Sequence, residues 1–474
     1  MDVFLNYLNN RMADVRRQGQ AVSPMELALL LREGMKYSPG NPVLLTELAC
    51  LMAGQGLAWE AYRLARLAHG LDGNARAASV INLVENPPLP QEITFETTTV
   101  CNLKCPLCEN GAGQMTTARQ HMPYETFAAV WEKLRPTTKR LILVGYGETF
   151  LHPDVYRILG CVKGTPYVYI DTNGNVDLDC ERVIRAGVTD FTFSVDGINQ
   201  EMYARYRRGG NLERVLRNVR ALVAAKRRLG AARPTITFKF IVFKHTEMYV
   251  EEAKRLAAEL GVDQFRLEPC TFKPCFGEEA FRQFMPLSPD HQRIDYVDFE
   301  KGEVGCPPHR DSRHCSVPMG SAMVTVEGEL TACCGTNHVT SFGNLITQSY
   351  EEVWRSPEYA RFRLKVMANR HAEPVCRVCS RELHSLGRFF EGTELAEAVP
   401  PPQSEPVAGR CYLKDNRVSA AEMAELVAAG RTKEAAYFAS IGKAESTAPE
   451  VAAAQMGAAS APVADAPIAS APIS

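Results

Sequence analysis

The chain has 474 residues, of which 46% are hydrophobic and 23% charged, and its formal net charge is −2. This composition fits two or three globular domains and excludes a mainly disordered chain. The small charge gives no long-range attraction to nucleic acid, and no apolar run reaches the ~18 residues that a membrane-spanning helix needs. The N-terminal residues lack the pattern of a signal peptide, so we expect a cytoplasmic protein that binds neither nucleic acid nor membrane.

Residues 1–90 carry apolar residues at helical spacing and predict an all-α region. Within it, residues 44–71 resemble one tetratricopeptide-type (TPR-like) hairpin, with Ala49, Gly56 and Ala61 as small residues where two helices can pack closely. A free-standing solenoid needs roughly three repeats, so this region is expected to be an appended cap. It could dock a protein partner, or it could be a lid that packs on the next domain.

Residues 91–295 alternate strand and helix patterns six times. The predicted strands are 92–99, 140–145, 167–172, 190–196, 235–243 and 264–269. Such a series predicts an α/β fold in which crossover helices connect parallel strands, as a partial barrel, a full barrel or an open sheet. In each of these architectures ligands bind at the carboxyl ends of the strands, so the chemistry is expected there.

The remaining chain divides by composition into three parts. Residues 296–390 are rich in cysteine and predict a small α+β module built around metal. Residues 391–445 predict a helical extension, in which Ser419 and Glu422 have the spacing of a capping box. Residues 446–474 are rich in Ala, Pro and Ser and are expected to be disordered.

Fifteen cysteines in a chain without an export signal indicate metal binding rather than disulfides. Cys101, Cys105 and Cys108 follow the first predicted strand with the spacing C-x3-C-x2-C. Three thiolates on one loop can hold three irons of a [4Fe–4S] cube and leave the fourth iron open. A zinc site would need a fourth ligand, which the neighbouring sequence does not offer.

This loop, placed after a first strand, resembles that of the radical S-adenosylmethionine (SAM) superfamily, in which SAM chelates the open iron. The turn 145–148 is similar to the family's Gly-Gly-Glu turn, with Tyr146 as a departure. Residues 171–174 are similar to its Thr-Asn-Gly, and 193–197 to its Ser-x-Asp-Gly. The residues that the resemblance implies at SAM are Gly145, Gly147, Glu148, Asn173, Ser194, Asp196 and Arg207.

The resemblance implies a partial (β/α)6 barrel with SAM and a [4Fe–4S] cluster as cofactors. It also implies reductive cleavage of SAM to a 5′-deoxyadenosyl radical that abstracts hydrogen from a substrate C–H. An external one-electron donor, such as flavodoxin or ferredoxin, is then needed as a partner. The sequence identifies no catalytic acid or base, because Lys239 and Glu268, which could face the cavity, are residue types more often found in salt bridges.

A second group of cysteines ends in a C-x2-C pair and consists of Cys315, Cys333, Cys376 and Cys379. With the segment that follows Phe342, it resembles the auxiliary-cluster module called SPASM or, when shortened, twitch. The sequence lacks the further C-x5-C-x3-C run of the full module, so the resemblance implies one auxiliary [4Fe–4S] cluster with four protein ligands. Cys306 and Cys334 receive no role, and a structural zinc is the alternative.

Three functions remain open at this point. The expected one is the oxidation or rearrangement of a small polar molecule, such as an amino sugar or cyclitol, with the auxiliary cluster as electron acceptor. The first alternative is a maturase that modifies a peptide or protein side chain. The second is a non-catalytic iron–sulfur carrier or scaffold, against which the intact set of SAM motifs argues.

Overall fold

The computed structural model describes residues 40–54, 58–292, 296–300, 303–305 and 317–377, together with Cys315 and Cys379. The predicted helical extension and tail, residues 1–39 and 55–57 of the predicted cap with its Gly56, and Cys306 lie outside the described residues. Within the described part, no helix is both long and apolar enough to span a bilayer.

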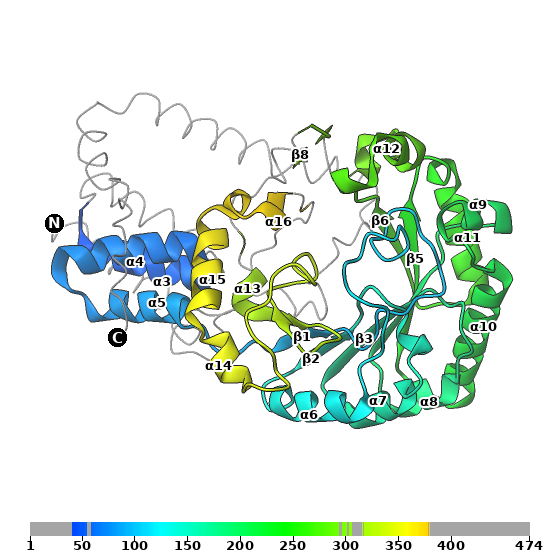
Figure 1. Ribbon diagram of the computed structural model, residues 1–474, viewed down its shortest axis with the longest axis horizontal. Helices are drawn as coiled ribbons and strands as arrows, with labels where there is room; N and C mark the ends of the chain where they lie inside the picture. The colour runs from blue at the N-terminus through cyan, green and yellow to red at the C-terminus, as the bar shows by residue number, and fades with distance from the viewer. Residues whose placement is uncertain are drawn as a thin grey trace, which may run out of the picture. The chain divides into compact units, whose positions relative to one another are not determined.

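Three helices form the described N-terminal region, which is all-α as predicted (Figure 1). They are α3 (Pro42–Gly54), α4 (Ala58–Asp72) and α5 (Ala75–Glu85). On α4 the buried residues are all alanines at helical spacing, Ala58, Ala61, Ala65 and Ala68, which allows close packing. Asn74 begins α5, because its side chain accepts the backbone N–H groups of Arg76 and Ala77.

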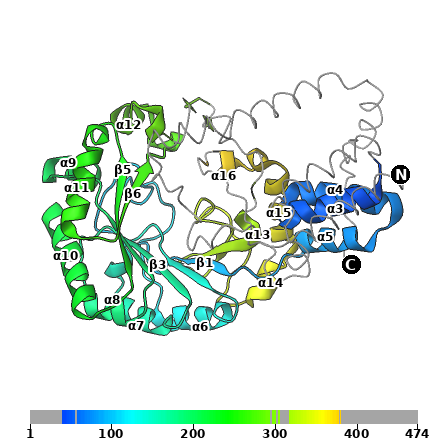
Figure 2. The same ribbon diagram turned by 180° about the vertical axis from the view of Figure 1, so that it is seen from behind.

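The N-terminal helices share an apolar core with the C-terminal part of the chain. Met319 of α13 (Val317–Gly320) and Met367 of α15 (Pro357–Asn369) are buried in the same cluster as the alanines of α4. Both views show α15 beside α3 and α4 (Figures 1 and 2). The indole N–H of Trp354 also donates to the carbonyl of Pro87 at 2.9 Å. These contacts support a packing role for this region, although the partner is the C-terminal part of the chain and not, as the sequence predicts, the next domain.

Deleting residues 1–85 is expected to destabilise the C-terminal part without abolishing SAM cleavage. The deletion exposes Met319 and Met367, and each buried methionine contributes roughly 1.5–3 kcal/mol. The SAM motifs predicted from the sequence all lie between residues 101 and 207. Hydrogen exchange should therefore accelerate in residues 317–369 while uncoupled formation of 5′-deoxyadenosine persists. Unchanged exchange in that segment would contradict the packing role.

One eight-stranded sheet organises the rest of the described chain, in the order β10-β9-β1-β2-β3-β4-β5-β6. Its strands are β1 (Glu92–Phe95), β2 (Arg140–Leu143), β3 (Tyr167–Thr172), β4 (Asp190–Ser194), β5 (Thr235–Val242), β6 (Gln264–Pro269), β9 (Ser321–Val324) and β10 (Leu330–Thr331). All neighbours are parallel except β9 and β10. Since β6 and β10 end the sheet without pairing to each other, β1–β6 form a partial barrel, as predicted.

Helices connect the parallel strands and lie along the outer face of the curved sheet (Figure 1). They are α6 (Tyr124–Leu134), α7 (Val155–Cys161), α8 (Cys180–Arg185), α9 (Gln200–Tyr206), α10 (Leu212–Arg228) and α11 (Val250–Leu260), whereas α12 (Glu278–Phe284) follows the edge strand β6. On β3 the side chains alternate, so that Val168 and Ile170 pack in the main apolar core with the helices. Tyr169 and Asp171 therefore point to the opposite, inner face.

The cysteine-rich region contributes the hairpin β9–β10 and the helices α13, α14 (Tyr350–Trp354), α15 and α16 (Pro374–Arg377). The separate pair β7 (Tyr296–Asp298) and β8 (Glu303–Gly305) precedes it. The sequence predicts a separate module here, but β9 pairs with β1, with Phe95 opposite Val324. The main sheet therefore continues into the C-terminal region, because β1 presents an edge that β9 covers.

Candidate functional site

The first cysteine loop follows β1 at the carboxyl edge of the sheet. Cys105 is buried, whereas Cys101 and Cys108 are partly exposed, and the three thiols lie close enough for their charges to influence one another. The loop folds tightly on itself, since a Cβ on Gly111 would meet the backbone nitrogen of Cys105 at 2.4 Å. The backbone N–H of Lys104 donates to the carbonyl of Arg208 at 2.9 Å and fixes the loop to the segment after α9.

Two side chains reach the sulfurs of this loop, one from the turn after β3 and one from the C-terminal end of α9. Nδ2 of Asn173 lies 3.8 Å from Sγ of Cys101, and a guanidinium nitrogen of Arg207 lies 3.9 Å from Sγ of Cys105. Burial raises the pKa of the Cys105 thiol to about 11, while the charge of Arg207 opposes that rise. Ligation of iron needs thiolates, so a fixed cation and an amide donor beside the sulfurs suit an iron–sulfur cluster.

Glu148, predicted at SAM, has its buried carboxylate committed to the protein. It accepts the hydroxyl of Thr172 and the backbone N–H of Asn173, both at 2.7 Å, and the N–H of Phe150 at 3.2 Å. Burial raises the pKa of this carboxyl group, and the three hydrogen bonds oppose the rise. Glu148 thus holds the turn after β3 in place, which positions Asn173.

Asp196 positions Arg207 in a similar way. Its fully buried carboxylate accepts Nε of Arg207 at 2.7 Å and the backbone N–H of Ile241 at 2.6 Å. Asp196 itself has a φ of +50°, an uncommon conformation for a residue other than glycine. The nearby negative charges of Asp196 and Cys105 raise the pKa of Arg207 in spite of its burial, so the guanidinium stays charged.

Ser194 lies on the inner face of the sheet, two residues before Asp196. Its hydroxyl donates to Oδ1 of Asp171 at 2.8 Å, and Lys239 forms an ion pair with the other oxygen of that carboxylate. Glu268 pairs with Arg266 at 3.2 Å. Lys239 and Glu268 therefore both form the salt bridges that their residue types favour.

The two glycines of the turn 145–148 are required because neighbouring atoms leave no room for a side chain at either position. A Cβ on Gly145 would lie 2.3 Å from Cγ of Glu96, and a Cβ on Gly147 would lie 2.3 Å from the carbonyl oxygen of Thr98. The turn after β2 is thus pressed against the segment that follows β1. The SAM-binding roles of all seven residues implied by the resemblance stay predictions.

Sequence reasoning missed Asn102, which links the cysteine loop to the turn after β3. Its side chain accepts Nδ2 of Asn173 at 2.9 Å and donates to the carbonyl of Asn175 at 2.7 Å. The only signal for it in the sequence is an amide directly after Cys101.

The second group of four thiols also comes together. The charges of Cys315, Cys333 and Cys379 all act on Cys376. Burial raises the pKa of Cys315 to about 12 and raises that of Cys376 as well. Cys334 is exposed, and its charge acts on the phenol of Tyr146 rather than completing this set.

The spacing of the thiols bears on the choice between a cube and a single ion. Among the residues that the structure describes, no three His, Cys, Asp or Glu side chains converge closely enough to hold one metal ion. Zinc draws its thiolate ligands to ~2.3 Å from one centre, whereas the thiolates of a cube bind separate irons at its corners. The three thiols of the loop after β1 suit three irons of a cube, and the four thiols of the second set suit either a cube or a zinc ion.

Comparisons with known proteins agree with these two sites. Residues 95–257 match the family model of the Radical SAM superfamily, and residues 315–380 match that of SPASM, an iron-sulfur cluster-binding domain. Together the two matches include every cysteine of both sets, as well as the strand-end motifs of β2, β3 and β4.

Two curated relatives match this chain at low identity. The antilisterial bacteriocin subtilosin biosynthesis protein AlbA of Bacillus subtilis is 24% identical over 288 residues, which is 57% of this chain and 60% of that protein. The tungsten-containing aldehyde ferredoxin oxidoreductase cofactor-modifying protein of Pyrococcus furiosus is 23% identical over 335 residues, 64% of this chain and 90% of that protein. This chain thus spans less than two thirds of the first relative.

Among solved structures, SuiB of Streptococcus suis bound to S-adenosylmethionine covers 64% of this chain and 73% of its own, with 12% identity and a TM-score of 0.45. The sequence matches and the two thiol sets at the positions just described agree. The chain carries a Radical SAM domain at residues 95–257 and a SPASM iron-sulfur domain at residues 315–380, and these domains bind SAM and iron–sulfur clusters.

Proposed function

We propose that this enzyme modifies a peptide or protein by abstracting hydrogen from one of its C–H bonds. One observation carries the reaction type: a loop of three thiols at the carboxyl edge of the sheet, with Asn173 and Arg207 directed at two of its sulfurs. The cluster and SAM, when bound there, supply the 5′-deoxyadenosyl radical. The chain's own residues bind the cluster, orient SAM and fix the turns around it.

We assign the residues of this site as follows. Cys101, Cys105 and Cys108 bind the cluster through three of its irons. Arg207, held by Asp196, and Asn173, held by Glu148, place a cation and an amide donor at the sulfurs. The remaining SAM contacts that we propose come from Gly145, Gly147 and Ser194.

Cys315, Cys333, Cys376 and Cys379 are proposed to hold the auxiliary [4Fe–4S] cluster. Four protein ligands leave no iron open, so the chemistry that this cluster supplies is electron transfer rather than substrate binding. A net oxidation of the substrate is the outcome that such an electron acceptor favours.

One of the two curated relatives supports a peptide as substrate. One is named for the biosynthesis of a bacteriocin, which is a peptide, and the other as a cofactor-modifying protein. Neither name points to an amino sugar or cyclitol, so the small sugar-like substrate expected from the sequence has no support from the relatives. The match to an enzyme superfamily likewise favours catalysis over a carrier or scaffold.

A substrate panel tests this proposal. The anaerobically reconstituted enzyme is mixed with SAM, a donor such as flavodoxin, ferredoxin or dithionite, and either short peptides encoded near its gene or amino sugars and cyclitols. We expect one peptide to accelerate formation of 5′-deoxyadenosine and to change in mass. Turnover of a sugar, with every peptide of the panel unchanged, would overturn the peptide proposal but leave the radical chemistry intact.

A further inference from the structure

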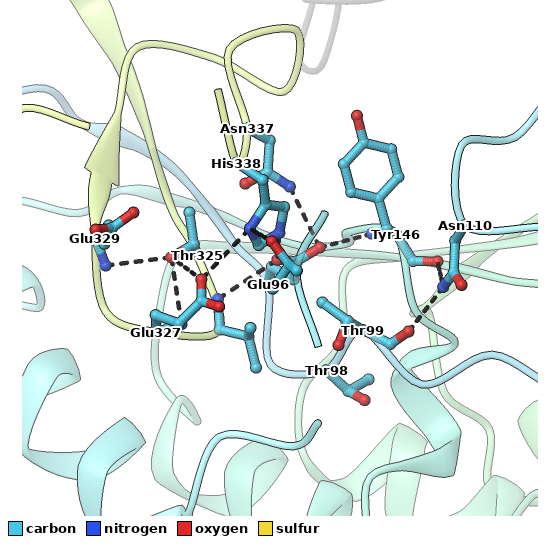
Figure 3. Close-up of polar contacts among 12 residues, drawn as sticks. Glu96, Thr98, Thr99, Asn110, Tyr146, Thr325, Glu327, Glu329, Asn337 and His338 are labelled. Carbon is cyan, nitrogen blue, oxygen red and sulfur yellow. Dashed lines mark hydrogen bonds and ion pairs between the residues drawn. The ribbon is translucent and has the colours of Figure 1, made fainter. Parts of the chain in front are cut away.

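Glu96 is a buried carboxylate that receives four N–H groups from two parts of the chain (Figure 3). One oxygen accepts the backbone N–H of Tyr146 at 2.7 Å and Nδ2 of Asn337 at 3.3 Å. The other accepts Nε2 of His338 at 2.6 Å and the backbone N–H of Val326 at 3.4 Å. A carboxylate this deeply buried is stable only with such partners, so its position depends on all of them.

The partners of Glu96 belong to different domains. Tyr146 lies in the turn 145–148 of the radical SAM domain, whereas Val326, Asn337 and His338 lie in the SPASM domain. His338 is 242 residues away from Glu96 in the chain. Because Gly145 rests directly on the side chain of Glu96, a shift of this carboxylate must move the turn.

His338 is held firmly on the SPASM side. Its side chain is 6% exposed, and its Nδ1 contacts the hydroxyl of Thr117 at 2.8 Å and the carboxylate of Glu327 at 3.4 Å. Its φ of +57° is uncommon for a residue other than glycine and persists only where the surroundings fix the backbone. Burial lowers its pKa, but Glu96 and Glu327 outweigh this and raise it, which favours the protonated ring beside Glu96.

The turn is also fixed from the cluster side. Nδ2 of Asn110, two residues after Cys108, donates to the carbonyls of Tyr146 and Thr99 at 2.8 and 2.7 Å (Figure 3). The phenol of Tyr146 donates to Glu109. The backbone of Tyr146 is therefore held through its carbonyl by the cluster loop and through its N–H by Glu96.

We propose that Glu96 and His338 are positioning residues for SAM, through which the SPASM domain holds the turn 145–148. This inference rests on the proposed function, in which that turn contacts SAM. His338 fixes Glu96, Glu96 fixes the N–H of Tyr146, and the turn then presents Gly147 and Glu148 in their places. The SPASM domain thus contributes to the SAM site in addition to carrying its own cluster.

Two substitutions of His338 test the roles of its two ring nitrogens separately. In His338→Gln the amide takes the place of Nε2 and can still donate to Glu96, whereas in His338→Asn it takes the place of Nδ1 and cannot. We expect the Asn variant to raise KM for SAM about tenfold, the size of one lost charge-assisted hydrogen bond, and the Gln variant to stay within about threefold of wild type. Neither should change kcat as much as KM.

A spectroscopic readout accompanies the kinetics, because a merely structural role would not affect it. SAM changes the EPR spectrum of the reduced cluster when it binds. In His338→Asn this change should need about tenfold more SAM, as KM does, while the iron content stays unchanged. If that variant does not fold, Glu96→Gln provides the same test, since it keeps an acceptor for Tyr146 but loses the charge that faces His338. It should also raise KM.

Lys133→Met is the matched control. Nζ of Lys133 on α6 donates to the carbonyls of Leu345 and Gln348 at 2.5 and 2.9 Å, so it also joins the two domains, but none of these bonds involves the turn. Its KM for SAM should equal that of wild type. If the Asn and Gln variants of His338 both bind SAM like wild type, Glu96 only links the two domains and the inference is wrong. A wild-type enzyme that binds no SAM would instead overturn the proposed function.

Discussion

Replacing Cys101, Cys105 and Cys108 together with alanine is expected to reduce formation of 5′-deoxyadenosine to the background rate. These are the thiols of the loop after β1, and without them the cluster that must reduce SAM has no ligands. The SPASM thiols are untouched, so iron should fall from about eight to about four per chain. Liquid chromatography of the nucleoside products and iron analysis measure the two effects.

A triple replacement elsewhere controls for the loss of three thiols. Cys50 and Cys180 are buried and Cys161 is partly buried, and none of them belongs to either set. Changing these three to alanine should leave both iron content and SAM cleavage near wild type. Conversely, continued production of 5′-deoxyadenosine by the first triple variant under strong reductant would show that the cluster lies elsewhere.

Replacing Cys376 and Cys379 with alanine is expected to separate SAM cleavage from product formation. The auxiliary cluster loses two of its four proposed ligands, so about four irons should remain and the substrate should not be fully oxidised. SAM cleavage should persist, because Asn337 and His338, which contact Glu96, lie on a different segment. Mass spectrometry of substrate and nucleoside in one reaction measures both.

Two results would contradict this expectation. Fully oxidised product from a folded double variant that lacks the second cluster would rule out its role as electron acceptor. Wild-type protein with about four irons and a bound zinc would instead favour a structural metal, since zinc alone can contribute folding energy.

The sequence predicts the β/α core well, because each strand and helix is encoded by a local pattern. It overestimates β1, predicted for 92–99 but ending at Phe95. Beyond that point Glu96 turns inward to its hydrogen-bond partners, and Thr98 forms only an isolated bridge with His121. The sequence also does not reveal that β9 pairs with β1, because the pattern of a strand shows which of its faces is buried but not which strand lies beside it.

At the site, the spacing of the cysteines predicts two groups, and the structure brings each of them together. The sequence cannot show how the polar motif residues divide their bonds. The carboxylates of Glu148 and Asp196 accept hydrogen bonds from Asn173 and Arg207. These bonds form only because separate loops pack together. The contact of Glu96 with His338 spans two domains, and no local pattern encodes it.

The pairing of β1 with β9 has a consequence for the synthesis of the chain on the ribosome. β1 ends at Phe95, but its partner β9 begins only at Ser321. At 5–20 residues per second, roughly ten to fifty seconds pass between the two. For that time the newly made barrel has an unpaired, apolar strand edge, which invites association with other nascent chains. Chaperone binding to this edge during translation would protect the enzyme until β9 has been synthesised and pairs with β1.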